Sequence, residues 1–323
     1  MFRRETSPLI DHYRALSYRN TILVLRIPGA MSGAVAAVEL PPGIILREMT
    51  FDDIPAGLAL CRASRWNQVA RDWEQFLLLE PHGAAVAVRD RRVIGSVATL
   101  RFEKRFGWVS MVLVDPAERG QGVGRALLLQ GLATLGDVVA RLDATPAGDV
   151  LYRKLDFEEE YRLTRFQREP ALMAASSPGE PVHPVDTDDW PSLLSLDAQV
   201  FGADRSDMLK WLAEGAPEYG WVCRSSGTVE GFLFGRHGHD FEHLGPVVAR
   251  DVDVAQRLVG ECLARYPARR FILDAPDQHA SWQAWLQESG FAVQRPFIRM
   301  YRGRHLHPGS AEHLYATIGP EFG

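Results

Sequence analysis

The stretch MVLVDPAERGQGVGRALL, residues 111–128, decides the fold that we expect for this chain. Residues 111–114 form a short apolar, β-branched run, and Asp115-Pro116 ends it because proline cannot donate to a β-ladder and restricts the residue before it. The segment RGQGVG, residues 119–124, follows, and the apolar residues after it are spaced to cover one side of a helix. The sequence therefore predicts a strand, a tight loop and a helix, with glycines where the helix begins.

Glycine at the start of a helix suits the binding of an anion. Without a Cβ atom the backbone comes close to a ligand, and the unpaired N–H groups and the positive dipole end of the helix attract negative charge. We therefore expect a phosphate group at this loop. A Rossmann loop needs glycine or alanine where this chain has Arg125, and a P-loop needs Gly-Lys-Ser/Thr where Gly124 is followed by Arg125-Ala126. Both of these motifs fit badly.

The pattern Arg119-x-x-Gly122-x-Gly124, between a strand ending in Val-Asp-Pro and an amphipathic helix, resembles the signature of the GNAT superfamily of acetyl-CoA-dependent N-acyltransferases. The resemblance implies that N–H groups of the loop hold the CoA pyrophosphate and that pantetheine pairs with the preceding strand as another strand would. The residues that it assigns to acetyl-CoA are Val112, Leu113, Val114, Arg119, Gly120, Gln121, Gly122, Val123, Gly124 and Arg125. The alternative is a glycine-rich turn that only lets a helix pack closely on a sheet.

Length and composition bound the other possibilities. The 323 residues suffice for two domains, and 46% hydrophobic with 24% charged residues is typical of a soluble globular protein. A net charge of −5 argues against a general nucleic-acid binder. Cys61, Cys223 and Cys262 form no C-x-x-C pair, and no apolar run approaches the roughly eighteen residues of a membrane span. We therefore expect a cytoplasmic protein, monomeric or homodimeric, without nucleic-acid or membrane partners.

Residues 1–42 are interpreted as an N-terminal extension that is poorly ordered, because the first clear strand is at residues 43–47. The apolar run at 21–25 makes a poor signal peptide, since Arg26 interrupts it. Our hypothesis is that Met31 is the true start of the chain. Native protein whose mass begins at Met1 would contradict it.

A pair of helices is predicted after the first strand, at about residues 52–60 and 69–79. Indole rings beside amide and carboxylate groups suit one wall of an acceptor pocket, with an apolar face and a few orienting hydrogen bonds. The residues of this wall are Trp66, Asn67, Asp72 and Trp73. The GNAT resemblance adds that this helix pair borders the acceptor site. The alternative is that both tryptophans belong to the core and Asn67 is a helix cap.

Three consecutive strands, at residues 83–89, 93–102 and 107–114, predict an antiparallel meander. The helix at 122–135 then crosses to a strand at 138–143, and such a unit makes a parallel strand pair. The GNAT resemblance implies that this parallel pair splays apart and opens a slot for the acyl donor. The expected fold class is α/β (α+β), with a mixed, mostly antiparallel twisted sheet flanked by helices.

The segment LYRKLDF, residues 151–157, resembles a second GNAT signature, in which the tyrosine stands close to the thioester sulfur. Tyr152 is therefore a candidate general acid, and the alternative is a packed aromatic residue. Asp156 stands where the family most often has glycine. Aspartate tolerates the left-handed conformation of a helix C-cap less well than glycine does.

The second half of the chain repeats the first in outline. Residues 171–184 are interpreted as a linker between a catalytic domain at 43–170 and a GNAT-like domain at 185–323. Residues 142–144 (LDA) correspond to 273–275 (LDA), and 163–166 (LTRF) to 298–301 (IRMY). In place of the glycine loop, the second half has VARDVDV, whose two acids would repel a pyrophosphate. We therefore expect a degenerate copy that has lost the cofactor site.

This second half resembles the C-terminal domain of some tandem GNAT proteins, which implies that it closes over the acceptor pocket. The candidate acceptor residues that it would supply are Asp204, Arg205 and His237, with Arg236 and His239 beside them. No cluster of His, Cys and Asp has convincing zinc spacing, so no metal is expected.

The function that the resemblance implies is direct transfer of acetyl from acetyl-CoA to the primary amine of a small molecule, within a ternary complex. The backbone N–H of Leu113 or its neighbour would stabilise the oxyanion, and Tyr152 would protonate the departing thiolate. The sequence indicates no convincing general base; Ser110 and Asp72 are guesses. The alternatives are a non-catalytic acyl-CoA sensor or partner-docking protein, and a protein N-acetyltransferase.

Overall fold

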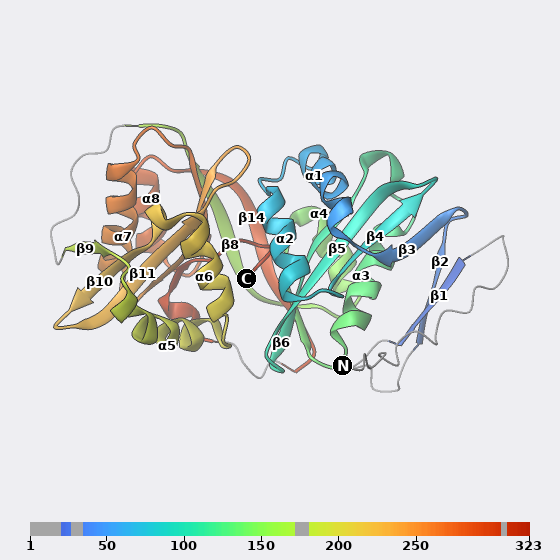
Figure 1. Cartoon of the computed structure of the whole chain (residues 1–323), viewed down its shortest axis with the longest axis horizontal. Helices are drawn as coiled ribbons and strands as arrows, with labels where there is room; N and C mark the ends of the chain where they lie inside the picture. Colours follow the sequence, from blue (N-terminus) through green and yellow to red (C-terminus); the bar gives the residue numbers. More distant parts are fainter. Residues whose placement is uncertain (1–20, 27–34, 172–180, 305–308) are drawn as a thin grey trace, which may run out of the picture.

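The computed structural model describes residues 21–26, 35–171, 181–304 and 309–323. All of its described strands except the first two form one sheet, which runs through both halves of the chain (Figure 1). Helices cover both faces of this sheet. From edge to edge the strands are β3 (Ile44–Glu48), β4 (Ala84–Arg89), β5 (Arg92–Phe102), β6 (Phe106–Val114), β7 (Val139–Ala144), β14 (Ala292–Arg302), β8 (Glu158–Arg168), β13 (Phe271–Pro276), β12 (Glu242–Ala249), β11 (Thr228–Arg236), β10 (Trp221–Ser225) and β9 (Val182–Pro184), with β15 (Leu314–Ala316) paired to β12.

The helices pack on the sheet around three hydrophobic cores. One core lies beneath α3 in the first half, and a second lies beneath α7 and α8 in the second half. The third core is shared, because α1 and α2 of the first half meet α5 and α6 of the second. The helices are α1 (Ile54–Ala63), α2 (Ala70–Leu79), α3 (Val123–Leu135), α4 (Pro146–Arg153), α5 (Trp190–Phe201), α6 (Ser206–Gly215), α7 (Val252–Arg265) and α8 (Ala280–Glu288).

The predicted meander and crossover are confirmed. β4, β5 and β6 pair antiparallel, and β6 pairs with β7 in parallel after the α3 crossover. The parallel pairing joins only residues 106–108 to residues 139–141, so the two strands separate beyond Trp108. The sheet therefore has a gap beside the second half of β6, where a splayed pair was predicted.

The two halves exchange strands at the centre of the sheet. β14, from the second half, lies between β7 and β8 of the first, and β8 lies between β14 and β13 of the second. Each of these strands has 11 residues, and together they form the central antiparallel pair in Figure 1. Each half therefore completes its own sheet with a strand from the other.

Two buried ion pairs mark this internal symmetry. Arg299 of β14 binds Asp143 of β7 through two hydrogen bonds of 2.8 and 2.9 Å, and Arg165 of β8 binds Asp274 of β13 through two of 2.7 Å. The symmetry thus equates Arg165 with Arg299, one residue away from the alignment expected from sequence, which matched Arg165 to Met300. The expected repeat is right in outline and wrong in register, because the matching arginines are fixed by partners on other strands.

Replacing Arg299 with methionine should lower the free energy of unfolding by about 3–5 kcal/mol, because Asp143 would remain buried without its partner. Unfolding in urea measures the loss. Arg250→Met removes an exposed arginine from ion pairs with Glu230 and Asp251 and should leave the midpoint unchanged. A loss below about 1 kcal/mol in Arg299→Met would contradict this role for the exchanged strand.

Two boundaries differ from the sequence interpretation. Strands β1 (Thr21–Arg26) and β2 (Val35–Leu40) form a two-stranded antiparallel sheet within the segment interpreted as an extension, and the remainder of residues 1–34 lies outside the described residues. β9 pairs with β10, so its residues belong to the second sheet half and not to the linker. Residues 172–180 of the linker lie outside the described ranges.

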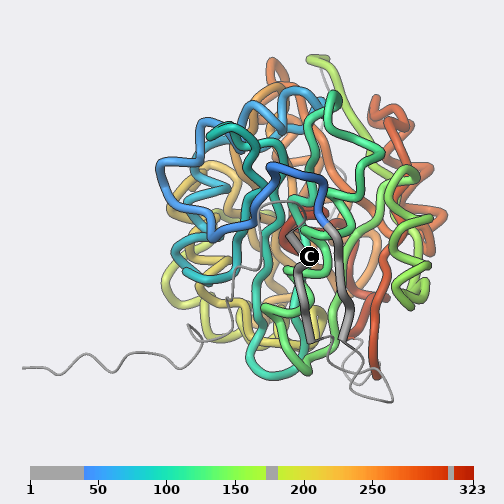
Figure 2. The backbone as a smooth tube through the Cα atoms, turned by 90° about the vertical axis from the view of Figure 1, so that its right-hand side faces the viewer, coloured from blue at the N-terminus to red at the C-terminus, as the bar shows by residue number. Residues whose placement is uncertain are grey.

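The C-terminal residues lie between the two halves, near the middle of the molecule in both Figure 1 and Figure 2. Phe322 is buried against Phe76 and Trp211, and the indole N–H of Trp108 donates to the Pro320 carbonyl at 3.0 Å. These contacts place Glu321 in the interior. Within the described ranges, none of the helices has the length and apolar character that a bilayer crossing requires.

Candidate active site

A β-bulge in β6 shapes the edge of the gap. Ala98 pairs with Ser110 and Ser96 with Leu113, so two residues of β6 face a single residue of β5. Met111, in the bulge, has a φ of 53°, and its carbonyl accepts a hydrogen bond of 2.9 Å from the Ser96 hydroxyl. The bulge turns the strand at the point where it leaves β7.

The N–H groups that face the gap follow from strand alternation. Asp115 donates to the Ile94 carbonyl of β5 at 2.8 Å, so alternate residues before it turn away from β5. Leu113 therefore directs its N–H to β5, and Val112 and Val114 direct theirs into the gap. Of the two options predicted for the oxyanion donor, Leu113 or its neighbour, this pairing favours the neighbours of Leu113, because pairing with β5 uses every second N–H.

The loop after β6 has the open backbone that an anion requires. Gly120 and Gly122 have φ angles of 78° and 85°, and a Cβ atom on either would meet nothing within 4 Å. Gly122 is the N-cap residue of α3. The buried carboxylate of Glu118, just before the loop, forms ion pairs with Arg89 and Arg92 and so fixes the start of the loop to the sheet.

Basic side chains surround this end of the site. Arg65, Arg119, Arg125 and Lys154 line the cavity with exposed side chains, and Arg119 Nε donates to the Val114 carbonyl at 3.1 Å. The residues predicted for acetyl-CoA all line the cavity except Gln121, whose amide oxygen accepts from Arg89. Positive charge and free N–H groups together suit the phosphates of CoA.

Tyr152 projects from α4 into the same cavity. A Cβ on Gly148 would come within 2.7 Å of its ring, so glycine there lets the ring lie across the helix. Burial raises the pKa of Tyr152 to about 12, which keeps the phenol protonated at neutral pH. Asp156 adopts a φ of 62°, so the left-handed turn after α4 forms with aspartate in place of glycine.

The cavity has a volume of about 1090 Å³ and crosses the sheet at the gap between β6 and β7. On one face it is lined by Val112, Val114 and Tyr152, which pack against the core beneath α3. On the other face it is lined by Trp66 and Met111, which belong to the shared core or pack against it. The loop and Tyr152 thus approach the bulge from one side of the sheet, and the shared core approaches it from the other.

The exchanged strand β14 extends the second face. Ile298 and Met300 pack beneath α3, so alternation turns Arg295 and Phe297 to the opposite side. Both line the cavity, together with Arg165 of β8. This wall joins the two halves of the chain.

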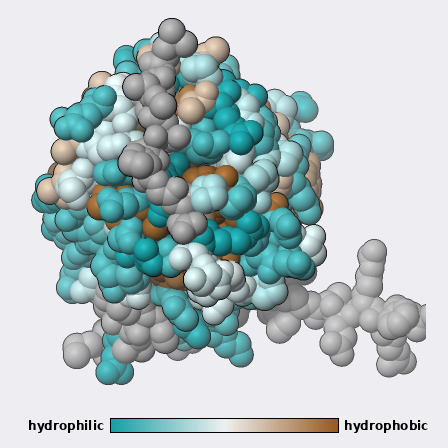
Figure 3. Space-filling view, turned by 90° about the vertical axis from the view of Figure 1, so that its left-hand side faces the viewer, coloured by the Kyte–Doolittle hydropathy of each residue, from teal (hydrophilic) through white to brown (hydrophobic). Residues whose placement is uncertain are grey.

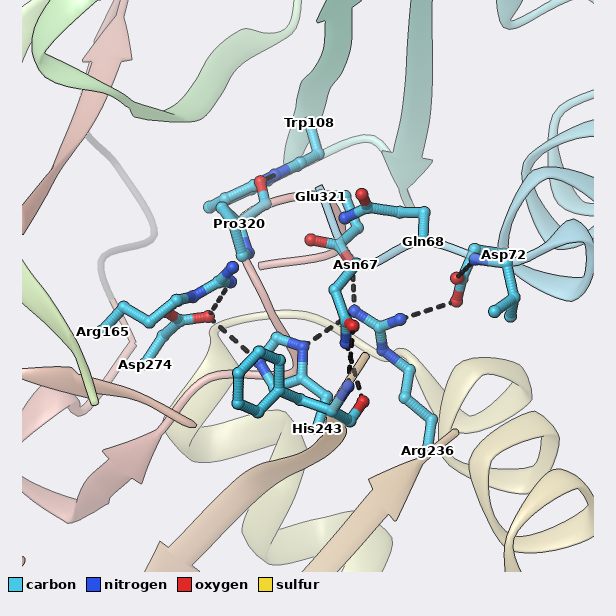
Figure 4. Close-up of polar contacts among 12 residues, drawn as sticks. Asn67, Gln68, Asp72, Trp108, Arg165, Arg236, His243, Asp274, Pro320 and Glu321 are labelled. Carbon is cyan, nitrogen blue, oxygen red and sulfur yellow. Dashed lines mark hydrogen bonds and ion pairs between the residues drawn. The ribbon is translucent and has the colours of Figure 1, made fainter. Parts of the chain in front are cut away.

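Glu321 supplies a carboxylate to the same region. Its side chain is buried, and its Oε2 atom has no hydrogen-bond partner among the described residues, although the amide of Gln68 lies beside it (Figure 4). Although burial opposes ionisation, the adjacent Arg236 guanidinium holds the pKa of Glu321 below its usual value. The cavity therefore contains a carboxylate that remains charged at neutral pH.

A buried polar network holds Glu321 in place (Figure 4). Arg236 binds Glu321, Asp72 and the Nδ1 atom of His243, and His243 Nε2 lies 3.0 Å from Asp274. A guanidinium can only donate, so Nδ1 accepts and Nε2–H donates to Asp274. Burial, followed by the charge of Arg236, lowers the pKa of His243 and keeps it neutral.

Of the predicted acceptor residues, Trp66 lines the cavity and the others do not. Asn67 links the two halves of the chain by hydrogen bonds. Its amide nitrogen donates to the carbonyl of Phe241 in the second half, and its amide oxygen accepts from the N–H groups of Asp240 and Phe241. Trp73 is fully buried in the shared core, as the alternative interpretation had it. The sequence gives the helix pair correctly but not the direction of its side chains.

The remaining predicted acceptor residues form hydrogen bonds and ion pairs with other residues of the protein. Asp72 is sealed behind Arg236, and Arg205 forms a buried bidentate ion pair with Asp197 at 2.8 Å. Asp204 accepts from the N–H of Ser206 at the start of α6, and His237 contacts Glu242 at 2.7 Å on the surface. The polar residues that line the acceptor side and that the sequence did not assign to it are Gln68, Arg165, Arg295 and Glu321.

The described connection between β12 and α7 contains no glycine, unlike the glycine loop of the first half. Asp251 caps α7, and its carboxylate accepts from the Val254 N–H at 3.0 Å. A carboxylate already occupies the helix N-terminus that would otherwise attract a phosphate.

Comparison with known proteins identifies the chain. A family model described as acetyltransferase (GNAT) domain matches residues 80–159, and a second model with the same description matches residues 193–316. The chain belongs to the GNAT acetyltransferase family. It is a tandem GNAT protein, with one acetyltransferase domain in each half.

Relatives of this GNAT protein agree with that assignment. An uncharacterized N-acetyltransferase of Bacillus subtilis, YitH, is 26% identical over 67% of this chain and 76% of its own length. The crystal structure of a protein described as an acetyltransferase from Pyrococcus horikoshii matches with a TM-score of 0.73 at 21% identity, covering 87% of this chain and 96% of that one. A tandem GNAT protein from the clavulanic acid biosynthesis pathway matches with a TM-score of 0.57 at 15% identity, covering 80% and 98%. The two structural matches establish the fold.

GNAT acetyltransferases use acetyl-CoA and act on an acceptor. In this tandem GNAT protein, residues of the glycine loop and of β6 in the first half line one cavity. Among the described residues, no group of three or more His, Cys, Asp or Glu side chains is arranged to hold a metal ion.

Proposed function

We propose that this protein transfers the acetyl group of acetyl-CoA to the primary amine of a small molecule, by direct attack within a ternary complex. The observation that carries the proposal is that one continuous cavity crosses the sheet beside the β6 bulge. Its basic, glycine-lined end suits CoA, and its opposite end contains the Glu321 carboxylate. Two substrates entering from opposite faces would meet at the bulge, which reduces the entropy of bringing them together.

The residues at the bulge have separate roles in this proposal. The N–H groups of Val112 and Val114 face the gap, where they would donate to the carbonyl oxygen of the thioester as negative charge develops on it. Tyr152, protonated at neutral pH, would give its proton to the departing thiolate of CoA. The Arg119 side chain and the N–H groups at the start of α3 would hold the pyrophosphate.

Glu321 would hold the amine. Glu321 lines the cavity and its Oε2 atom has no hydrogen-bond partner among the described residues, so its carboxylate would attract an ammonium group although Arg236 already binds its other oxygen. The low pKa of Glu321 makes it a weak base, so its main role would be to position the amine while water accepts the proton. Asp72 is buried and paired with Arg236, so it does not reach the acceptor as a general base would need to.

Glu321→Gln should lower kcat/KM for an accepted amine by about 10- to 100-fold, because one charge-assisted hydrogen bond is lost. Steady-state kinetics against the amine measures this, and titration calorimetry of acetyl-CoA serves as the control. The Kd of acetyl-CoA should not change, because the loop lies on the other face of the sheet. Equal loss of acetyl-CoA binding would indicate a general structural defect and remove the proposed role.

The surrounding protein favours a small acceptor over a protein one. Glu321 and Arg295 both come from the second half, which closes the acceptor side of the first. The outer end of the second half, in the part of that face that the structure describes, is mostly hydrophilic with only small apolar patches (Figure 3). On this face the described residues offer no large apolar patch for a docking protein.

A further inference from the structure

The charged residues at the acceptor end of the cavity are unevenly paired. Arg165 and Asp274 neutralise one another in a bidentate pair. Arg236 is shared between two carboxylates, those of Asp72 and Glu321. The Glu321 end of this region therefore has one negative charge in excess.

Arg295 supplies the opposite excess. It forms no ion pair with any residue that the structure describes, and its buried Nε atom has no hydrogen-bond partner there. Burial and then the charge of Arg165 lower the pKa of Arg295 to about 10, so the guanidinium is still charged at neutral pH. Its charge lies 5.6 Å from the centre of the Phe297 ring, and that of Arg165 lies 5.1 Å from the same ring.

The internal symmetry of the chain shows how unusual this arrangement is. Arg165 and Arg295 are cross-strand partners on β8 and β14, and the equivalent pair in the other half is Arg299 with Tyr161. There, Arg299 donates to the Tyr161 hydroxyl at 2.6 Å, a favourable contact. Two arginines opposite one another repel, so Arg295 weakens the strand pair that Tyr161 strengthens. An arginine in this place is explained by an anion that binds to it.

We infer that the acceptor is a small amine that also has an anionic group, carboxylate or phosphate, which binds Arg295 while the amine binds Glu321. This inference rests on the proposed acetyl transfer and names the class of its acceptor. The cavity then matches a zwitterion, with excess positive charge at one point and excess negative charge at another. Phe297, whose ring centre lies 5.6 Å from the Arg295 charge and 5.1 Å from the Arg165 charge, would offer an apolar surface to the carbon chain between the acceptor's two charges.

Matched pairs of amines test this inference. The carboxylate arm compares 4-aminobutyrate with butylamine and L-phenylalanine with phenethylamine, and the phosphate arm compares phosphoethanolamine with ethanolamine. Release of free CoA thiol gives kcat/KM for each. We expect the anionic member of at least one pair to be preferred by about 10-fold or more, as a charge-assisted hydrogen bond provides.

Substitution of Arg295 locates the preference. In Arg295→Gln the preference should fall to near unity, mainly through a higher KM for the anionic amine, and Arg295→Lys should restore part of it. Loss of the repulsion from Arg165 should leave thermal stability equal or higher. Arg250→Gln, an exposed arginine outside the cavity, should keep the wild-type preference.

The outcomes separate the inference from the proposed function. Turnover of neutral amines equal to or better than that of every anionic partner would overturn the inference and leave the transfer activity standing. Calorimetric titration of each of the three anionic amines into CoA-saturated protein provides a readout without turnover. Binding that requires Arg295, without thiol release from acetyl-CoA by any amine, would support the anion site and overturn the proposed function. Absence of both binding and turnover across the six amines would overturn both.

Discussion

Gly122→Trp should raise the Kd of acetyl-CoA by at least about 100-fold, because the indole would fill the space where two or more N–H groups meet the pyrophosphate. A Cβ at this position points into open space, so the side chain would displace ligand and not protein. Isothermal titration with acetyl-CoA measures the effect.

The φ of 85° at Gly122 strains any other residue, and this cost needs a control. Gly227, in the turn between β10 and β11, has a φ of 80° and equally open surroundings outside the cavity. Gly227→Trp therefore imposes the same backbone strain without touching the loop. Acetyl-CoA that binds Gly122→Trp as tightly as Gly227→Trp would overturn the assignment of the loop.

Tyr152→Phe should lower kcat by about 10- to 1000-fold, within or just below the usual contribution of a positioned acid. The substitution removes only the hydroxyl and keeps the ring contact with Phe157, whose centroid lies 5.9 Å away. The affinity for acetyl-CoA should change little, so the loss should be confined to turnover. Steady-state kinetics at saturating acetyl-CoA measures it.

The pH profile provides a second test of Tyr152. A pKa of about 12 keeps the phenol protonated well above neutrality, so wild-type kcat should show no fall from its ionisation below about pH 11. Tyr266→Phe, in the second half and outside the cavity, is the matched control and should retain wild-type turnover. Unchanged kcat in Tyr152→Phe would remove this residue from the role of general acid.

The strand, glycine loop and helix at the proposed cofactor end were predictable from sequence because their information is local. The strand end at Asp115-Pro116, the glycines at 120 and 122 and the helix after them occupy one continuous segment. Backbone conformation and helix polarity dictate what such a segment attracts, whatever surrounds it. The sequence left the oxyanion donor open between Leu113 and its neighbour, since only pairing with β5 decides which N–H groups remain free.

The acceptor end was not predictable in the same way. Arg165, Arg295 and Glu321 are far apart in the chain and meet only because β8 and β14 exchange halves and the C-terminal residues fold inward. The repeat of LDA and a following arginine was the available signal, because its two arginines mark the exchanged strands. Polar residues that looked functional, such as Asn67 and Arg205, instead hold the structure together.

The measurement that tests the proposed activity most directly is release of free CoA thiol from acetyl-CoA by the purified full chain, with and without a pool of small primary amines. The account predicts release that depends on the amines, with an acetylated amine detected by mass spectrometry, and loss of both in Gly122→Trp. Tight binding of acetyl-CoA with no amine-dependent release from any member of the pool would contradict it, and would make the protein a sensor of acyl-CoA.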